Sequence, residues 1–408
     1  MNTRPHFTQR LHQEILDALV IGGGIHGASS AAALSHAGYR VGLVEAGDFA
    51  SETSQASSNM IWGGIKYFES LDFALVRELC HSRNALLRHY PNQVKEIRFY
   101  AVCEKPSPRP SPDAGASSER SERPAWQLQI GAWLYWLWGN ARTATPRRLR
   151  PKNIREEEPV LNSDRWTGGV EYSDAYLPET DARFAFGFIE RAWRNGAAAV
   201  NYVRAISCHK VGSLWETEVV DQITGAAWTI RSKVVVNAAG PWAETLAKSS
   251  GVPPKHRLAF SKGVHLIVPR LSDEKRVLSF FSSDGRPFFI LPLGGKTCLG
   301  TTDTRIDRPS KEVTPEDRAF ILENINQRLN LARPLVEADI IAERCGVRPL
   351  VLNGGENTEG NWMNLSRKHR VEISNSGFIS ILGGKMTDCL NIGNEILAAA
   401  NRCKLQPT

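Results

Sequence analysis

The sequence has no paired cysteines, no long apolar run and no long tract of one charge. Its seven cysteines are scattered and none forms a Cys-x-x-Cys pair, so a zinc site or a redox disulfide has little support. An odd, dispersed set of cysteines fits a reducing compartment. No apolar stretch approaches the ~20 residues of a membrane-spanning helix, and residues 1–15 lack the apolar core of a signal peptide. We therefore expect a cytoplasmic protein, or one that is peripheral on the inner face of the membrane.

The charge is positive overall but it is not concentrated. The chain has 408 residues and a net charge of +7 at pH 7, and its basic residues do not gather into one long tract. This pattern offers no motif for nucleic-acid binding, and it suits an anionic ligand, a phosphorylated substrate or an anionic membrane surface. The length allows roughly two domains, and the composition is ordinary for a globular protein.

The start of the chain carries a glycine-rich turn between two apolar strands. A strand at residues 17–21 is followed by a G-x-G-x-x-G turn at 22–27. A run that is compatible with a helix (28–37) and a second strand (39–44) come next. Gly22 allows the tight turn, Gly24 lets the backbone approach a pyrophosphate, and Gly27 lets the helix pack closely on the strand. Glu45 follows the second strand and can accept hydrogen bonds from an unphosphorylated ribose. The pattern predicts a dinucleotide site for FAD or NAD rather than NADP.

Two later segments have an unusual composition. Residues 104–124 are rich in Pro, Ser and charge, which is typical of a flexible surface loop. The Trp-rich segment 126–138 repeats apolar residues at helical spacing, namely Trp126, Ile130, Trp133, Leu134 and Leu137. This stripe favours a helix that buries it in the core. A helix on a membrane surface is the alternative, because Trp and Tyr prefer interfaces and a basic run at 142–152 lies next to it.

The rest of the chain alternates between helix and strand patterns. Helices are expected at 181–199, 314–331 and 386–401, and strands at 203–209, 214–220, 234–236 and 378–382. Short strands between 263 and 302 are typical of an antiparallel sheet. We therefore predict an α/β fold, with a Rossmann-like domain and an antiparallel-sheet substrate domain. The expected boundaries are 15–90, 165–255 and 340–405 for the nucleotide-binding domain, and 91–164 and 256–339 for the substrate domain.

Several motifs keep the order of one known family over nearly the whole chain. They are GGGIHGA (22–28), SQASSNMIWGGIKYFE (54–69), GGVEYSDAYLPETDAR (168–183), VVNAAGPWA (235–243), SKGVHLIVPR (261–270), LGTTD (299–303), GVRPL (346–350), SRKHR (366–370) and GGKMTD (383–388). The chain resembles the FAD-dependent glycerol-3-phosphate dehydrogenases, within the glycine/D-amino-acid oxidase-like flavoproteins, as a divergent member. The resemblance implies an FAD-binding domain of the glutathione-reductase/D-amino-acid-oxidase type.

The resemblance also implies a cofactor set and a reaction. The residues expected at FAD are Gly22, Gly24, Ile25, His26, Gly27, Glu45, Ser54, Ser57, Ser58, Ala238, Gly240, Gly384, Met386 and Thr387. The implied reaction oxidises a secondary alcohol by hydride transfer to flavin N5, and the closest substrate is glycerol 3-phosphate or a related phosphorylated polyol. Quinone or oxygen is the implied electron acceptor.

Basic residues in the matching motifs are the candidates for binding an anionic substrate, because a planar guanidinium pairs with two phosphate oxygens. The expected substrate set is Trp62, Lys66, Tyr67, Arg348, Arg367 and Lys385. His265 is expected to act as the base, since a neutral imidazole accepts a proton near pH 7, and Arg348 and Lys385 complete the catalytic set. A hydrogen-bonded histidine on a strand is an equal alternative for His265. The side chains of His26 and His369 are interpreted as structural.

The chain departs from the family pattern at Asn59, Trp62, Lys66 and Asp388, where the family has Lys, His, Arg and Thr. Lys66 keeps the charge but loses bidentate geometry. Trp62 removes a proton-handling group and adds bulk, and Asp388 is expected to add negative charge close to the flavin. These departures keep two alternatives open: an FAD-dependent oxidase or dehydrogenase of another 2-hydroxy acid or amine, and a catalytically silent FAD-binding subunit.

Overall fold

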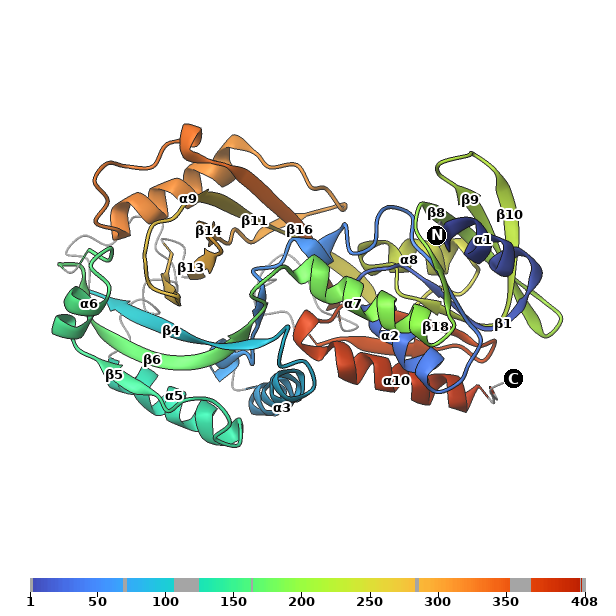
Figure 1. The fold of residues 1–408 in the computed structure, drawn as a ribbon, viewed down its shortest axis with the longest axis horizontal. Helices are drawn as coiled ribbons and strands as arrows, with labels where there is room; N and C mark the ends of the chain where they lie inside the picture. Colours follow the sequence, from blue (N-terminus) through green and yellow to red (C-terminus); the bar gives the residue numbers. More distant parts are fainter. Residues whose placement is uncertain are drawn as a thin grey trace.

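The chain folds into two lobes that lie side by side, each built on one β-sheet (Figure 1). The structure, a computed structural model, describes residues 3–68, 72–105, 125–162, 164–282, 286–352, 368–403 and 405, without the side chains of residues 66, 68 and 125. Sheet A lies in the lobe that holds both ends of the chain, and sheet B lies in the other lobe. The predicted loop at 104–124 falls outside the described residues from position 106 onward.

Sheet A contains the predicted dinucleotide unit. Its strands lie in the order β17-β18-β10-β1-β2-β7, and all of them except the edge strand β17 run parallel. Their bounds are β1 Ile15–Ile21, β2 Val41–Val44, β7 Ala198–Val200, β10 Ala227–Asn237, β17 Arg370–Ile373 and β18 Phe378–Leu382. A hairpin of β8 (Val203–Val211) and β9 (Leu214–Asp221) extends from the first half of β10. The two ends of the chain therefore share one sheet, as predicted.

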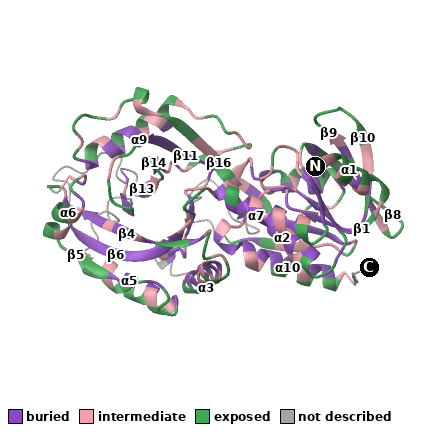
Figure 2. Cartoon of the chain, viewed as in Figure 1, coloured by how far each residue is buried: buried purple, intermediate pink, exposed green. Residues whose placement is uncertain are grey.

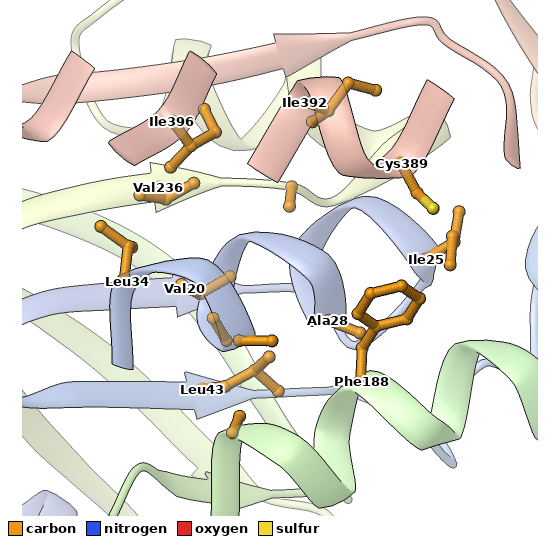
Figure 3. Close-up of a cluster of buried hydrophobic side chains, with 14 of the residues drawn as sticks. Val20, Ile25, Ala28, Leu34, Leu43, Phe188, Val236, Cys389, Ile392 and Ile396 are labelled. Carbon is orange, nitrogen blue, oxygen red and sulfur yellow. The ribbon is translucent and has the colours of Figure 1, made fainter. Parts of the chain in front are cut away.

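Three helices cover one face of sheet A and enclose its core. They are α2 (Ile25–His36), α7 (Asp181–Arg194) and α10 (Cys389–Arg402). Figure 3 shows Val20 and Val236 of the strands facing Leu34 of α2, Phe188 of α7 and Ile392 of α10. Each fully buried aliphatic or Phe side chain contributes about 1.5–3 kcal/mol through its removal from water. This apolar burial fixes the position of the glycine turn, because α2 begins directly after it.

The other face of sheet A is covered by α1 (Thr3–Gln13), α8 (Ala243–Ser249) and the β8–β9 hairpin. Leu19 and Ile21 of β1 point to this face and alternate with Ala18 and Val20, which point to α2, as the period of a strand requires. Because both faces of β1 are buried, its sequence reads as a nearly continuous apolar run.

Sheet B is antiparallel except for the parallel pair β12–β4. Its strands lie in the order β15-β11-β14-β13-β12-β4-β6-β3, and β16 and β5 join it beside β11 and β6. Their bounds are β3 Met60–Ile61, β4 Lys95–Glu104, β5 Arg147–Leu149, β6 Trp166–Tyr176, β11 Arg257–Pro269, β12 Arg276–Phe281, β13 Pro287–Leu293, β14 Lys296–Gly300, β15 Thr304–Ile306 and β16 Ala342–Leu352. The antiparallel sheet predicted between 263 and 302 is thus confirmed.

Helices α3 (Phe73–His89), α5 (Ala125–Trp138), α6 (Pro151–Glu157) and α9 (Pro315–Arg328) belong to the lobe of sheet B. Thr314 accepts a hydrogen bond from the backbone of Asp317 and Pro315 opens α9, so this predicted helix start is confirmed. The helix predicted at 181–199 ends at Arg194, because residues 198–200 join sheet A as β7. The closing helix begins at Cys389, after a 3₁₀ turn at Met386–Asp388.

The burial predicted for the Trp-rich helix is wrong. The expected core stripe of α5 is its exposed face, with Trp126 56%, Ile130 52%, Trp133 40%, Leu134 39% and Leu137 56% exposed. Figure 2 shows this exposed face on the outside of the lobe. The opposite face, with Ala132 and Tyr135, packs against the core. Apolar residues occur on both faces of α5, so helical spacing alone could not identify the buried one. Among the described residues, no helix is both long enough and apolar enough to span a membrane.

The strands at the junction of the lobes do not follow the expected domain boundaries. Strands β3, β6 and β16 fall within segments 15–90, 165–255 and 340–405, which were assigned to the nucleotide-binding domain, yet all three belong to sheet B. Alternation of apolar residues predicts a strand but does not identify the sheet that it joins. The chain therefore crosses between the lobes beside the site described next.

Candidate functional site

The carboxyl ends of the parallel strands of sheet A meet one edge of sheet B at a single cleft. The turns that follow β1, β10 and β18 supply Gly24, Ala238 and Gly384 to this cleft. Strands β11 and β16 of sheet B supply the opposite wall, including His265 and Arg348. Open α/β sheets bind their ligands at this place, outside the carboxyl ends of the strands.

Two glycines of the turn are required by close backbone contacts. Gly22 has a φ of +110°, and a Cβ there would lie 2.4 Å from the carbonyl oxygen of Ala238. A Cβ on Gly27 would lie 1.9 Å from the carbonyl oxygen of Gly22. Only glycine therefore lets α2 approach β1 this closely. Gly22 and Gly27 shape the turn from behind and do not line the cleft themselves.

The first turn of α2 opens into the cleft. Its N-cap residue, Gly24, has no side chain to cap the helix, and the N–H of Ile25 donates to Ser54 Oγ at 2.9 Å. Free N–H groups and the partial positive charge at a helix N-terminus favour an anionic group. The phosphates of a dinucleotide fit this end of the cleft, where Gly24, Ile25 and Ser54 all contribute to the lining.

Glu45 lies directly after β2, behind the glycine turn. Its carboxylate accepts hydrogen bonds from the backbone N–H groups of Gly23 at 2.6 Å and Gly47 at 2.8 Å. Burial raises the pKa of this carboxyl group, and the two backbone donors act in the opposite direction. Glu45 therefore holds the turn together, and like Gly22 and Gly27 it does not line the cleft.

His265 of β11 is a buried histidine without a partner. It is 2% exposed and lines the cleft, and neither of its ring nitrogens has a hydrogen-bond partner among the described residues. Burial, together with the charges of Arg348 and Arg344, lowers the pKa of His265 to about 3. The imidazole is therefore neutral at pH 7. An unsatisfied buried polar group costs about 1–3 kcal/mol, which a bound molecule that hydrogen-bonds to it would offset.

Arg348 of β16 reaches across Gly263 of β11. A Cβ on Gly263 would lie 2.2 Å from Arg348 Nη2, so glycine is needed to make room for the guanidinium. Arg348 Nη1 lies 3.2 Å from Asp303 Oδ1, and Nη2 donates to Thr301 Oγ1 at 3.2 Å. The side chain is 26% exposed and lines the cleft. A guanidinium held in this way can pair with two oxygens of a phosphate or a carboxylate.

Lys385 and Tyr67 form a second cationic corner of the cleft. Lys385 Nζ donates to Tyr67 Oη at 2.5 Å and lies 4.1 Å from the centre of its ring. The carbonyl oxygen of Lys385 lies 3.3 Å from His26 Nε2. Burial lowers the pKa of His26 to about 4, so this imidazole is neutral and donates to the carbonyl. A Cβ on Gly384 would lie 2.6 Å from His26 Cε1, so α2 and this turn touch directly.

Trp62 forms an aromatic wall of the cleft. Its indole N–H donates to Tyr172 Oη at 3.4 Å, and its ring meets Phe289 edge to face at 5.8 Å between centroids. Its carbonyl oxygen accepts a hydrogen bond from Thr387 Oγ1 at 3.2 Å. Where the family has a histidine, this chain therefore places an anchored apolar ring.

The cleft brings together most of the site residues expected from the sequence. Those that line it are Gly24, Ile25, His26, Ser54, Ser57, Ser58, Trp62, Tyr67, Ala238, Gly240, His265, Arg348, Gly384, Lys385, Met386 and Thr387. The side chain of Lys66 and the whole of Arg367 lie outside the described residues. Asp388 does not line the cleft, because its carboxylate turns to His369 in the protein interior. The negative charge of Asp388 is therefore held in an ion pair outside the cleft lining.

Sequence reasoning missed four polar residues of the cleft: Thr53, Arg286, Thr301 and Asp303. Thr301 and Asp303 lie in the LGTTD motif, which was matched to the family without a role for its acid. Asp303 follows the end of β14 closely, and an acidic residue at a site that is expected to hold an arginine suggests an ion pair with that arginine. Arg286, whose guanidinium lies 5.4 Å from the centre of the Phe320 ring, had no such signal.

Comparisons with known proteins agree with this geometry. The family model of FAD dependent oxidoreductases (DAO) matches residues 17–387. The aerobic glycerol-3-phosphate dehydrogenase of Staphylococcus aureus (strain USA300) is 29% identical over 401 residues, which cover 97% of this chain and 68% of that protein. The glycerol-3-phosphate dehydrogenase of Bacillus halodurans, solved in complex with FAD, has a TM-score of 0.75 and 28% identity over 99% of this chain and 68% of that one.

A more distant structure shares the fold. The L-alpha-glycerophosphate oxidase of Mycoplasma pneumoniae, solved with FAD bound, has a TM-score of 0.71 and 16% identity over 95% of each chain. The fold class and the FAD cofactor predicted from the sequence are thus confirmed. The chain belongs to the DAO family and is an FAD-dependent oxidoreductase.

Proposed function

We propose that this enzyme oxidises a secondary alcohol that carries an anionic group, most closely glycerol 3-phosphate or a related phosphorylated polyol. The observation that carries the proposal is His265, which lines a cleft with Arg348 and Lys385 and whose two ring nitrogens have no hydrogen-bond partner in the part of the chain that the structure describes. A neutral base beside two cations suits the deprotonation of an alcohol on an anionic molecule. The names of the two glycerol-3-phosphate dehydrogenases that it resembles support this choice.

Each residue has a defined part in the proposal. Arg348 binds the anionic group, held in place by Asp303 and Thr301, and Lys385 provides the second positive charge. His265 is neutral at pH 7 and accepts the hydroxyl proton; because a pKa of about 3 makes the empty-site imidazole a weak base, the bound anionic substrate must raise that pKa for the transfer. The nearby cations stabilise the negative charge that develops on the alcohol oxygen. FAD supplies the hydride acceptor at flavin N5.

A substrate panel tests the proposal. Purified holoenzyme is mixed anaerobically with glycerol 3-phosphate, other phosphorylated polyols, 2-hydroxy acids and amines, and the bleaching of oxidised flavin is followed near ~450 nm. Fast bleaching by glycerol 3-phosphate or a close phosphorylated relative is the expected result. If these compounds leave the flavin oxidised while a hydroxy acid or an amine reduces it, the proposed substrate class is wrong.

Trp62 favours a second candidate function. Its ring replaces a proton-handling histidine of the family and narrows the cleft with apolar surface. An FAD-dependent oxidase or dehydrogenase of a larger 2-hydroxy acid or amine would use this wall for stacking, and its carboxylate would bind at Arg348. If no compound bleaches the flavin, the chain is a catalytically silent FAD-binding subunit.

We also propose that electrons pass to quinone or oxygen and that the enzyme contacts an anionic membrane surface through α5. The exposed stripe on α5 contains Trp126 and Trp133, and the basic run 142–152 follows it in the chain. Tryptophan and basic residues together are typical of a helix that lies in the interface of a bilayer.

A further inference from the structure

A second, separate chamber lies beside the cleft, between α5 and sheet B. It holds about 150 Å³. Three residues line both spaces, namely Trp62, Pro287 and Phe289, so their side chains form a shared wall. The reaction proposed above uses only the cleft side of this wall.

The lining of the chamber is apolar and rich in aromatic rings. Phe281 and Tyr172 contribute rings, Val170 and Leu128 contribute aliphatic surface, and Gln127 and Ser279 are its polar members. Among the described residues that line the chamber, none carries a charge. A closed apolar cavity of about 150 Å³ lined by Leu, Ile and Phe binds benzene, and the present chamber has the same volume but is partly open. The chamber therefore favours a small, uncharged, apolar group.

The aromatic side chains of the chamber favour a ring over an alkyl chain. The rings of Trp62 and Phe289 stand at 78° to each other, and Tyr172 stacks on Phe99 with 5.0 Å between centroids. Aromatic pairs prefer such edge-to-face and stacked arrangements, so a further ring can extend the same pattern. The hydroxyl of Tyr172 accepts the indole N–H of Trp62 at 3.4 Å and can still donate its own proton, so Tyr172 offers the chamber a ring with a polar edge.

The elements around the chamber are held in place by buried polar contacts. Asp174 of β6 accepts hydrogen bonds from Tyr135 Oη of α5 at 2.6 Å and from the backbone N–H of Gly63 at 3.2 Å. It also pairs with Arg83 at 3.2 Å, and both of these side chains are fully buried. One carboxylate thus fixes α5, which forms one side of the chamber, against the residue that follows Trp62. The space is preformed, and a ligand does not have to create it.

We propose that this chamber binds the ring of an uncharged aromatic molecule next to the FAD cleft. Binding of the ring does not depend on the proposed function. The identity of the molecule that carries the ring, electron acceptor or substrate, rests on that function. Either the electron acceptor or an aromatic group of the substrate brings such a ring to this place. Trp62 would then separate the ring from the flavin side of the cleft, and it would contact ligands on both sides.

Gly131 offers a position from which a larger side chain can enter the chamber. It lines the chamber, and a Cβ on it would meet no atom within 4 Å. Gly131→Leu should also favour the helical state of α5 by about 1 kcal/mol, so loss of the fold is not expected. Leu134→Gln, on the exposed face of the same helix, is the matched control. Leu128→Ala, which enlarges the chamber, is the second variant.

The experiment titrates holoenzyme with 2-naphthol and follows both tryptophan fluorescence and the unfolding temperature. Wild type and Leu134→Gln should bind 2-naphthol equally, and Gly131→Leu should bind it at least about tenfold more weakly. Leu128→Ala should change the affinity as well. The reason is that burial of the ring supplies most of the binding free energy. Equal binding by wild type and Gly131→Leu, or no binding by wild type, would overturn the proposal.

Two kinetic measurements show whether the electron acceptor or the substrate carries the aromatic ring. If the acceptor carries it, Gly131→Leu slows the reoxidation of reduced enzyme by 1,4-naphthoquinone and leaves anaerobic flavin reduction by glycerol 3-phosphate unchanged. If the substrate carries it, Gly131→Leu raises the KM for aryl-substituted alcohols and leaves reoxidation unchanged. A failure of glycerol 3-phosphate to reduce the flavin would count against the proposed function alone, because naphthol binding is measured without turnover.

Discussion

His369 and Asp388 form a buried ion pair behind the turn that faces the FAD cleft. His369 Nδ1 lies 2.8 Å from Asp388 Oδ2, and the two residues are 4% and 5% exposed. Glu395 approaches the other ring nitrogen at 3.1 Å, and Ser82 donates to Asp388 Oδ1 at 3.0 Å. The charge of Asp388, which replaces a family threonine, is therefore balanced by His369 in the protein interior. Through His369 and Ser82, Asp388 connects the start of α10 to β17 and α3.

This pair predicts a defined pH dependence of stability. Desolvation lowers the pKa of His369, but the hydrogen bond to Asp388 and the charges of Asp388 and Glu395 outweigh it, so the pKa is raised. A raised histidine pKa contributes stability that is fully present below about pH 6.5 and is lost as the pH rises through the folded-state value. We expect His369→Gln to lower the free energy of unfolding by about 3 kcal/mol at pH 6, because it leaves a buried charge unpaired.

The measurement is urea unfolding of holoenzyme between pH 5 and about pH 9, where the gap between wild type and His369→Gln should narrow at alkaline pH. Lys233→Gln is the control. It breaks the pair between Lys233 and Asp17, 2.7 Å apart at the other end of sheet A, and should lower stability equally across this range. A gap for His369→Gln that does not vary with pH would contradict the assignment.

His265→Asn tests the base. The substitution removes a group that can accept the substrate proton, so we expect the rate of flavin reduction to fall by about 10²–10⁴-fold. FAD content should stay the same. His256→Asn, which changes a histidine paired with Glu372 outside the cleft lining, should leave the rate near that of wild type. A normal rate in His265→Asn would make His265 a structural residue.

Arg348→Ala tests the anion site. Loss of the guanidinium should raise the apparent KM for a phosphorylated substrate by roughly 10–100-fold, because a charge-assisted pair contributes about 1.5–3 kcal/mol. FAD content should change far less. Arg348→Lys should recover part of the loss, since it restores charge without the bidentate geometry. Equal kinetics in wild type and Arg348→Ala would remove this residue from the substrate set.

Two glycine substitutions separate packing from helix propensity. Gly27→Ala places a Cβ where the carbonyl oxygen of Gly22 lies, 1.9 Å away, so α2 must shift. We expect a stability loss of about 1–3 kcal/mol or more, and a lower FAD content measured by absorbance. Gly131→Ala meets no atom within 4 Å and should be neutral or slightly stabilising. Full FAD occupancy in Gly27→Ala would refute the steric argument.

The exposed stripe of α5 predicts binding to anionic vesicles. Trp133→Ser combined with Leu137→Ser removes apolar surface from this stripe and should reduce co-sedimentation with anionic liposomes. Salt should weaken the binding of the wild type, because the attraction between basic residues and anionic lipid is screened. Wild-type protein that stays in the supernatant with anionic vesicles would argue against the membrane contact.

Local sequence patterns predicted much of this fold because their physical causes are local. The glycine turn, the strand before it and the helix after it follow from steric needs that neighbouring residues impose, as Gly22 and Gly27 show. The start of α9 at Thr314 and Pro315 follows from capping within one turn. By contrast, the buried face of α5 and the sheet that β6 joins depend on residues far away in the chain.

Motifs in the amino-acid sequence were enough to predict the fold class, the FAD cofactor and the residue types available to the cleft, because motifs record local backbone geometry and chemistry. How those residues are used follows from the packing of distant segments. This packing left His265 without a hydrogen-bond partner among the described residues, held Arg348 against Asp303, and turned Asp388 to His369. Burial and ion pairing act between segments that are distant in sequence, so their outcome depends on how the two sheets pack together.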